Sequence, residues 1–384
     1  MTGRVPEGDR SSKASAVSAR TVSAAAVARE AGVSTATVSY VMNGQGGVSE
    51  HTRRRVLTLA REMGYRPRSG PRIPDARRNN VVGLVVPNMT NPMFPRWAQG
   101  VVDRAAEIGH EVFLASTSDD ADVMTSTVQA MIARKVDGLI LASIPREEVA
   151  ALQLLRAARV PYVQLSRRSD FVAADFVGIE DAAAAEAMMH HVIGHGRHRV
   201  ATVIGPRFSS ASAARERGYL ATAEALGIRV PPEWRLSTRL NNAGGRLAAQ
   251  ELLAGGSPPD AILCGSDEVA IGVIEYLLKQ GLKVPEDVVV TGFDGLPHSR
   301  SALVSLTTVV QPQIGMAKAA FDVLQARIDD PAAPYQSLVM PHELWIGRTC
   351  GCPPESQSHP DTPTPDLVRQ NETTPNHTTQ QEPE

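Results

Sequence analysis

Residues 23–67 form the stretch that most constrains the fold, because they read as three short helices with a tight turn between the first two. Ser23 can cap a first, alanine-rich helix, and Gly32 supplies the backbone freedom that ends it. Ser34 can then cap a second helix that spans 35–42. A turn of this length between two short helices is typical of a helix-turn-helix unit.

A third helix is expected after Ser49, and its apolar residues recur with a 3.6-residue period. These residues are Val56, Leu59, Ala60 and Met63. In the second helix the valines are expected to face inward, whereas Thr35, Ala36 and Tyr40 point away. The short side chains on this outward face can reach phosphate or base edges without crowding a DNA groove. The three helices therefore predict a DNA-binding head.

The charge is divided unevenly along the chain. Residues 1–80 hold 14 lysines and arginines against 6 aspartates and glutamates, a net charge of +8, whereas the remainder holds 25 against 35. A basic head on an acidic body is expected where only the head meets phosphate, although a basic disordered leader would give the same imbalance.

The sequence also indicates where the protein resides. No apolar run reaches the roughly eighteen residues that a membrane span requires. The first twenty residues lack the apolar core of a secretory signal. We therefore expect a cytoplasmic, nucleoid-associated protein with disordered segments at 1–20 and 351–384.

The cysteines and histidines do not predict a metal site. Cys264 lies in an apolar run and reads as a small core residue. Cys350 and Cys352 are expected to be poor zinc ligands, because no histidine or further cysteine stands near them in the sequence. Four histidines near one predicted helix end read as cations that suit its dipole; they are His190, His191, His195 and His198. No GxSxG, P-loop or HExxH motif occurs, so neither an enzyme nor a cofactor is predicted.

From Val81 onward, apolar runs such as VVGLVVP, EVFLAS and DGLILAS alternate with helical segments. Helices are expected near 95–109, 123–134, 147–158, 182–193, 213–226 and 268–280. Apolar runs of this kind separated by helices indicate parallel sheets covered on both faces. Ligands bind such sheets beyond the carboxyl ends of the strands, so the residues directly after each strand are the candidates for a binding site.

The runs AVAREAGVSTATVSYVMNG and VSEHTRRRVLTLAREMGYRP resemble the head of the LacI/GalR family of bacterial transcription factors, and the resemblance continues over about 21–350. It implies that the second helix lies in the major groove, with Thr35, Ala36 and Tyr40 toward the bases. Many members carry arginine where Tyr40 stands, so a different base preference is expected here. The resemblance places further residues at phosphate or sugar: Ser23, Ser34, Thr37, Ser39, Asn43 and Thr52.

The segment between Tyr65 and Val81 departs from this family, which usually has a short hinge helix there. Gly70, Pro71 and Pro74 fall inside the expected helix, at interior costs of about 1 kcal/mol for Gly and about 3 kcal/mol for Pro. We expect the hinge to stay extended and to hold the DNA backbone through arginines. These are Arg66, Arg68, Arg72, Arg77 and Arg78. A plain flexible linker is the alternative.

For the body, the resemblance implies the fold of periplasmic sugar-binding proteins, in which two doubly wound lobes close on a small molecule. It places effector contacts after strands, at Phe94, Arg215, Ser266, Asp267 and Asp294. Ser166 stands where an aspartate is common, and Arg239 stands where an aromatic residue usually stacks on the ligand. One carboxylate lost and one arginine gained favour an anionic or phosphorylated effector. Taken singly, each residue could instead serve the core or a surface ion pair.

Together these features predict an α/β protein with a helix-turn-helix head (21–67), a hinge (68–80) and a two-lobed body (81–350) with doubly wound parallel sheets. The predicted function is a dimeric transcriptional repressor that binds a pseudo-palindromic DNA site under the control of a sugar, sugar phosphate or related metabolite. The alternatives are a regulator whose body no longer binds ligand, a cytoplasmic solute-binding protein and a sugar-processing enzyme. The head and the absent signal peptide argue against the second, and missing acid–base pairs argue against the third.

Overall fold

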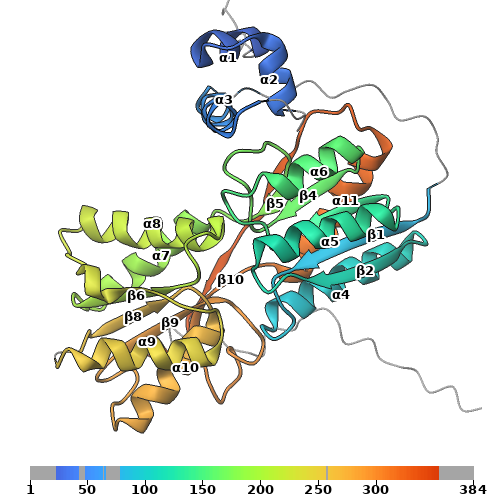
Figure 1. Cartoon of the computed structure of the whole chain (residues 1–384). Helices are drawn as coiled ribbons and strands as arrows, with labels where there is room; N and C mark the ends of the chain where they lie inside the picture. Colours follow the sequence, from blue (N-terminus) through green and yellow to red (C-terminus); the bar gives the residue numbers. More distant parts are fainter. Residues whose placement is uncertain (1–22, 43–47, 64, 66–77, 257, 354–384) are drawn as a thin grey trace, which may run out of the picture.

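The computed structural model describes residues 23–42, 48–63, 65, 78–256 and 258–353. Figure 1 shows a small helical head beside a larger body of two lobes, each built on a β-sheet with helices on its faces. The expected disordered leader, nearly all of the expected tail and most of the hinge lie outside the described residues. Within those ranges, no helix is both long enough and apolar enough to cross a membrane.

The head consists of α1 (Ala24–Ala31), α2 (Thr35–Met42) and α3 (Glu50–Glu62). The Ser23 hydroxyl accepts a hydrogen bond from the Ala26 amide at 3.3 Å, and Gly32 ends α1 with φ 65°, where a side chain would be strained. Val38 and Val41 are buried as predicted, whereas Val33 is only partly buried. In α3 the four predicted apolar residues all pack in the core of the head, with Val56 and Ala60 buried and Leu59 and Met63 partly buried, and Leu57 is an additional buried residue.

The first lobe contains a six-stranded, all-parallel sheet in the order β11-β5-β4-β3-β1-β2. The strands are β1 (Val81–Val86), β2 (Glu111–Ser116), β3 (Gly138–Leu141), β4 (Tyr162–Leu165), β5 (Asp175–Gly178) and β11 (Ser337–Val339). Alternate strand residues serve opposite faces: Leu84 packs with Val101 of α4, and Val85 packs with Val128 of α5. The helices are α4 (Met93–Glu107) and α11 (Gln313–Asp329) on one face, and α5 (Ala121–Ala133) and α6 (Ala150–Ala158) on the other.

The second lobe repeats this architecture with a sheet in the order β12-β10-β9-β8-β6-β7, in which only β12 is antiparallel to its neighbour. The strands are β6 (Val200–Ile204), β7 (Arg235–Ser237), β8 (Ala261–Cys264), β9 (Val289–Asp294), β10 (Thr307–Val310) and β12 (Glu343–Trp345). Its helices are α7 (Asp181–Gly194), α8 (Ser210–Ala225), α9 (Asn242–Ala254) and α10 (Asp267–Lys279), with the short 3₁₀ turns η1 (Pro232–Trp234) and η2 (Arg348–Cys350). Parallel strands covered on both faces confirm the fold class predicted from the alternation of strands and helices.

The chain passes between the lobes three times: from β5 to α7, from β10 to α11 and from β11 to β12. As a result β11 pairs with β5 of the first lobe, and α11 packs in that lobe (Figure 1), although both follow most of the second lobe in the sequence. Several predicted helices begin at slightly different residues: α4 starts at Met93 and α8 at Ser210, both earlier than expected, whereas α6 starts later, at Ala150. Ser209 supplies the cap that starts α8 early, because its hydroxyl accepts from the Ser212 amide.

Candidate functional site: a helical DNA surface and an interlobe crevice

The outer face of α2 carries the residues that the sequence placed toward DNA bases. Thr35, Ala36 and Tyr40 are all exposed, and the Tyr40 side chain is 48% exposed. Such exposure of a large aromatic residue has no role in the core of the head, whose buried side chains lie on the opposite face of α2. The geometry therefore leaves this face available to a partner, and its contact with bases stays a prediction.

The hydroxyl residues of the head take part in helix capping. The Ser34 hydroxyl accepts from the Thr37 amide at 3.0 Å and lies 2.9 Å from the Thr37 hydroxyl. The Ser49 hydroxyl donates to the Thr52 hydroxyl at 2.8 Å. These groups sit at helix amino-terminal ends, where positive dipoles attract phosphate. Ser39 is exposed, whereas Asn43, Arg66, Arg68, Arg72 and Arg77 lie outside the described residues. Arg78 is described and forms an ion pair with Asp329 at 2.7 Å.

A second candidate site is a narrow crevice between the lobes. It follows the carboxyl ends of strands in both lobes, as expected for doubly wound sheets. The lining residues are Asn91, Met93, Phe94, Trp97, Ser166, Arg167, Ser209, Ala211, Ser212, Arg215, Leu240 and Asp294. The free volume open to the centre of a water molecule is about 30 Å³, enough for only a few waters. A sugar would enter this crevice only when the lobes move apart.

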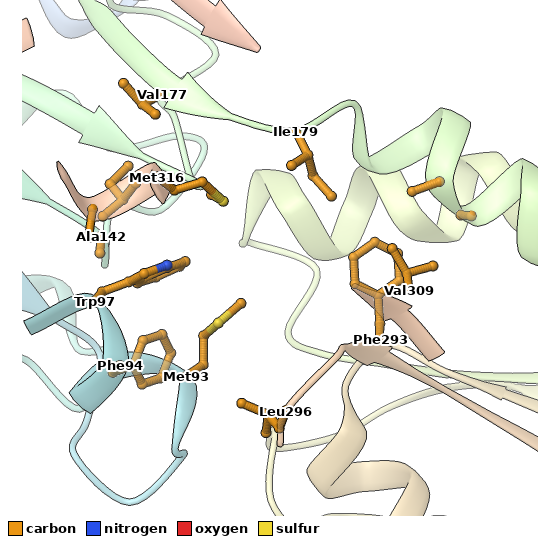
Figure 2. Close-up of a cluster of buried hydrophobic side chains, with 14 of the residues drawn as sticks. Met93, Phe94, Trp97, Ala142, Val177, Ile179, Phe293, Leu296, Val309 and Met316 are labelled. Atoms are coloured by element: carbon orange, nitrogen blue, oxygen red, sulfur yellow. The ribbon is translucent and has the colours of Figure 1, made fainter. Parts of the chain in front are cut away.

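The aromatic wall of the crevice comes from α4. Phe94 and Trp97 lie one helical turn apart with ring centroids 5.6 Å apart and planes tilted by 56°. Figure 2 shows Met93, Phe94 and Trp97 on one side of the interlobe space, with Phe293 and Leu296 across from them. Trp97 is 2% exposed, and its indole Nε1 has no hydrogen-bond partner among the described residues. A buried donor without a partner costs about 1–3 kcal/mol, so it marks a position where a ligand acceptor would be favoured.

Arg215 organises the polar wall. Its Nε donates to Asp181 at 2.8 Å, its Nη1 donates to the Gly265 carbonyl at 2.7 Å, and the same nitrogen lies 3.6 Å from Asp294. The guanidinium also stacks over the Phe293 ring at 3.7 Å. All three charged side chains are buried. One cation thus serves two carboxylates in a region of low dielectric.

Burial governs the protonation of this group. It raises the pKa of Asp294 well above the ordinary value, against the opposing effect of Arg215. Burial likewise raises the pKa of Asp181, again opposed by Arg215. Burial acts to lower the pKa of Arg215, but Asp181 and Asp294 more than offset it, so the guanidinium stays charged. The site therefore holds a fixed cation and carboxyl groups that are costly to ionise.

The remaining predicted effector residues divide into two groups. Ser166 lines the crevice in a left-handed conformation with φ 62°. Ser266 and Asp267 are fully buried and serve the structure instead: Ser266 caps α10, and Asp267 accepts from the Leu296 amide at 2.6 Å and from the Thr308 hydroxyl at 2.5 Å. Each Asp267 oxygen thus already accepts a hydrogen bond within the second lobe, and neither Ser266 nor Asp267 is among the residues that line the crevice, so their contact with an effector stays a prediction.

Arg239 does not line the crevice in this arrangement, and its contact with an effector stays a prediction. It is exposed, and Leu240 lines the crevice in its stead. The physical reason is local: Asn241 caps α9 by accepting from Gly244, and the resulting turn packs Leu240 against Gly205 while Arg239 faces solvent. The argument for an anionic effector that rested on Arg239 loses its support.

Direct bonds join the lobes at the crevice. The Asn91 amide nitrogen Nδ2 donates to the Leu240 carbonyl at 3.1 Å, and the Arg168 backbone amide donates to the Ser210 hydroxyl at 2.8 Å. Arg167 is buried and paired with Asp119 within the first lobe at 2.5 Å. These contacts define a closed arrangement held by a few polar bonds that a ligand could replace.

Sequence reasoning missed Trp97 and Asp181 as site residues. Trp97 stands three residues after Phe94, and a helix that began slightly before the predicted start near 95 would have put both on one face. Asp181 ends the run DFVGIED and stands three residues after Gly178, within the strand-to-helix connection to which the rule for doubly wound sheets points. Its ion pair with Arg215 joins two segments that are 34 residues apart, and no local sequence pattern predicts it.

A helix-turn-helix head joined to a two-lobed body with a crevice between the lobes defines a ligand-controlled DNA-binding regulator as the class of protein. Residues 25–68 match the family described as bacterial regulatory proteins, lacI family. Residues 79–343 match the family described as periplasmic binding proteins and sugar binding domain of LacI family. The chain belongs to the LacI family of transcriptional regulators, and it is not an enzyme.

Individual relatives agree with this assignment. The chain is 32% identical over 338 residues to the HTH-type transcriptional regulator MalR of Streptomyces coelicolor, covering 86% of this chain and 97% of the relative. It is 29% identical over 314 residues to the ribose operon repressor of Haemophilus influenzae, with coverage of 82% and 94%.

Solved structures show the same likeness. The transcriptional regulator CelR in complex with cellobiose matches with a TM-score of 0.67 and 28% identity, covering 85% of this chain and 99% of that one. The lac repressor dimer bound to operator and anti-inducer matches with a TM-score of 0.65 and 22% identity, covering 86% and 99%, which shows the shared fold.

Proposed function

We propose that this regulator reads its operator with the outer face of α2 and responds to a neutral sugar held in the interlobe crevice. Thr35, Ala36 and Tyr40 face the bases, and the capping hydroxyls of Ser23, Ser34 and Thr52 lie toward phosphate. Thr37, Ser39, Asn43 and the hinge arginines, including Arg66, Arg68 and Arg72, supply further backbone contacts. The observation that supports this assignment is the exposure of α2's small and aromatic outer residues on a head with its own buried core.

The lining of the crevice favours a polyol over an anion. Phe94 and Trp97 offer apolar ring surface for the C–H face of a sugar, and Trp97 Nε1 offers an unused donor. Arg215 and Asp294 offer a donor and an acceptor for hydroxyl groups, while Ser166 adds a short hydroxyl. The cation of Arg215 already serves two carboxylates, and Arg167 is neutralised by Asp119, so no unpaired buried cation awaits a phosphate among these lining residues. Relatives named for ribose and cellobiose support the sugar class.

Operator selection from random DNA tests both halves of this proposal. The full-length protein, which we place in the cytoplasm at the nucleoid, is expected to return a two-fold symmetric site. The reason is that a symmetric dimer binds two half-sites. Repeating the binding measurement with ribose, cellobiose and other mono- and disaccharides is expected to change the affinity at least tenfold for one of them. Binding that weakens steeply with salt and shows no sequence preference would contradict the proposal.

Trp97→Phe is expected to weaken binding of that sugar about tenfold, because the ring stays and only the indole donor is lost. Calorimetry on the variant measures the change. Trp345→Phe is the matched control: Trp345 Nε1 is also buried without a hydrogen-bond partner, but it lies outside the crevice lining. An equal loss in both variants would argue against a ligand bond from Trp97.

Exposed apolar residues support a homodimer formed through the body. Phe113 and Leu114 are exposed on β2, an edge strand, as are Val102 of the adjoining α4 and Ile108, which follows the last residue of α4. Leu247 of α9 is 65% exposed in the second lobe. Apolar groups clustered along one edge are more typical of an interface than of free surface.

Leu114→Asp is expected to raise the dimer dissociation constant at least tenfold, because it places an unpaired carboxylate in that interface. Sedimentation equilibrium measures the shift. Leu303→Asp serves as the control, since Leu303 is 94% exposed and lies on a loop outside this edge. An unchanged association state for Leu114→Asp would place the dimer interface elsewhere.

A further inference from the structure

Four potential metal ligands meet at one end of the second lobe, away from the crevice. His191 and His195 lie at the carboxyl end of α7, one turn apart on the same face. Cys350 ends η2, and Cys352 follows two residues later. The ligand atoms of these four side chains all lie within 4.8 Å of one another.

This arrangement corrects the prediction that Cys350 and Cys352 are poor zinc ligands. No histidine stands near them in the sequence, but the fold brings two histidines beside them. Cys352 Sγ lies 3.1 Å from His195 Nε2 and 3.7 Å from His191 Nε2. The two imidazole rings lie edge to face with centroids 4.8 Å apart. Reading the two histidines only as helix-end cations therefore misses their surroundings.

The donor set has the composition of a structural zinc site. Two thiolates and two imidazoles in tetrahedral geometry, with Zn–S about 2.3 Å and Zn–N about 2.0–2.1 Å, place the ligand atoms about 3.3–3.8 Å apart. The Cys352–His191 distance already falls within that range, and the Cys352–His195 distance is slightly shorter. Bringing the widest separation in the group from 4.8 Å into this range requires a shift of about 1 Å, within reach of small side-chain rotations.

The backbone that carries the cysteines is held firmly. The Thr307 amide donates to the Thr349 hydroxyl at 2.9 Å, which fixes η2 against β10. Gly351, between the two cysteines, adopts a left-handed conformation with φ 86°, and the ligand atoms of both cysteines lie within 4.8 Å of those of His191 and His195. Cys350 is buried, whereas Cys352 is partly buried and His195 is exposed. The cluster therefore combines a rigid base with a path for an ion from solvent.

We propose that His191, His195, Cys350 and Cys352 bind one Zn²⁺ ion in each chain. Four protein ligands fill a tetrahedral shell, which is the pattern of a structural site and leaves no position for substrate. The ion ties the carboxyl-terminal end of the body to α7. Both segments belong to the second lobe, so the ion strengthens that lobe at the end away from the crevice.

The first test uses the wild-type full-length protein. Protein purified without chelator is expected to carry about one zinc ion per chain by elemental analysis, and chelation is expected to lower its thermal unfolding midpoint. Replacement by Co²⁺ is expected to give an intense thiolate-to-cobalt absorption in the near ultraviolet with the visible bands of tetrahedral cobalt. Substoichiometric zinc with no such absorption would overturn the proposal. A protein lighter by two hydrogen atoms under non-reducing conditions, which indicates a Cys350–Cys352 disulfide, would also overturn it.

The second test separates the ligands from their neighbours. Cys352→Ser and His195→Gln are expected to reduce bound zinc at least tenfold and to abolish the effect of chelator on thermal unfolding. His190→Gln and Cys264→Ala are the matched controls, because His190 is exposed and faces Glu186, and Cys264 is buried in β8. Zinc retained by both ligand variants, or lost equally from the controls, would contradict the assignment. Operator binding by the ligand variants shows that the chain has folded.

Discussion

Ala36→Glu is expected to weaken operator binding about a hundredfold or more while leaving the fold intact. Ala36 is exposed in the first turn of α2 and contributes nothing to the buried core of the head. Glutamate forms helices nearly as well as alanine, so the substitution preserves α2. In the DNA groove, however, the introduced carboxylate is repelled by the phosphates, and it loses bound water without gaining a hydrogen-bond donor. The expected loss of binding free energy is about 1–3 kcal/mol at each half-site. It doubles in a dimer because both chains carry the substitution.

Fluorescence anisotropy with the selected operator measures this loss. Ala221→Glu provides the matched control, since Ala221 is exposed in the middle of α8 in the second lobe. That variant is expected to bind the operator within about twofold of wild type, as most exposed substitutions have small effects. If Ala36→Glu bound as tightly as the control, α2 would not be the reading helix.

Arg215→Met is expected to lower the free energy of unfolding of the body by about 3–5 kcal/mol. The variant keeps most of the side-chain volume but leaves Asp181 and Asp294 buried without their shared cation. Chemical denaturation at neutral pH measures the change. Arg207→Met is the control, because Arg207 pairs with Glu216 at the surface with 53% of its side chain exposed. A loss of less than about 1 kcal/mol is expected there.

The deficit of Arg215→Met should also depend on pH. Without the cation, the pKa values of Asp181 and Asp294 rise beyond their already raised values, because Arg215 is the largest effect that opposes burial at both groups. Near pH 4 the carboxyl groups are protonated in the folded variant at little cost. As pH rises, these two carboxyl groups ionise in the unfolded chain but stay protonated in the folded variant. The difference in unfolding free energy between the variant and wild type therefore grows. A pH-independent difference would show that lost packing, rather than buried charge, causes the effect.

Local sequence patterns predicted much of this structure. The caps at Ser23, Ser34 and Ser49 and the turn at Gly32 define three helices through bonds that span at most four residues. The alternation of apolar runs and helices likewise predicted both sheets. The helices α9 and α11 and the short strands β7, β10, β11 and β12 were not anticipated, because their segments lack a long apolar run or a strong period and take their places by packing against elements already formed.

Local sequence alone determined the reading head and the class of body, because helix capping, helical period and buried strands depend on neighbouring residues. Only the tertiary structure decided which polar residues face the crevice: it buried Asp267 in bonds to Thr308 and Leu296, and turned Arg239 to solvent. It alone placed two histidines beside two cysteines. Such pairings join segments more than a hundred residues apart, and the geometry of the packed lobes, rather than any pattern along the chain, selects which of them meet.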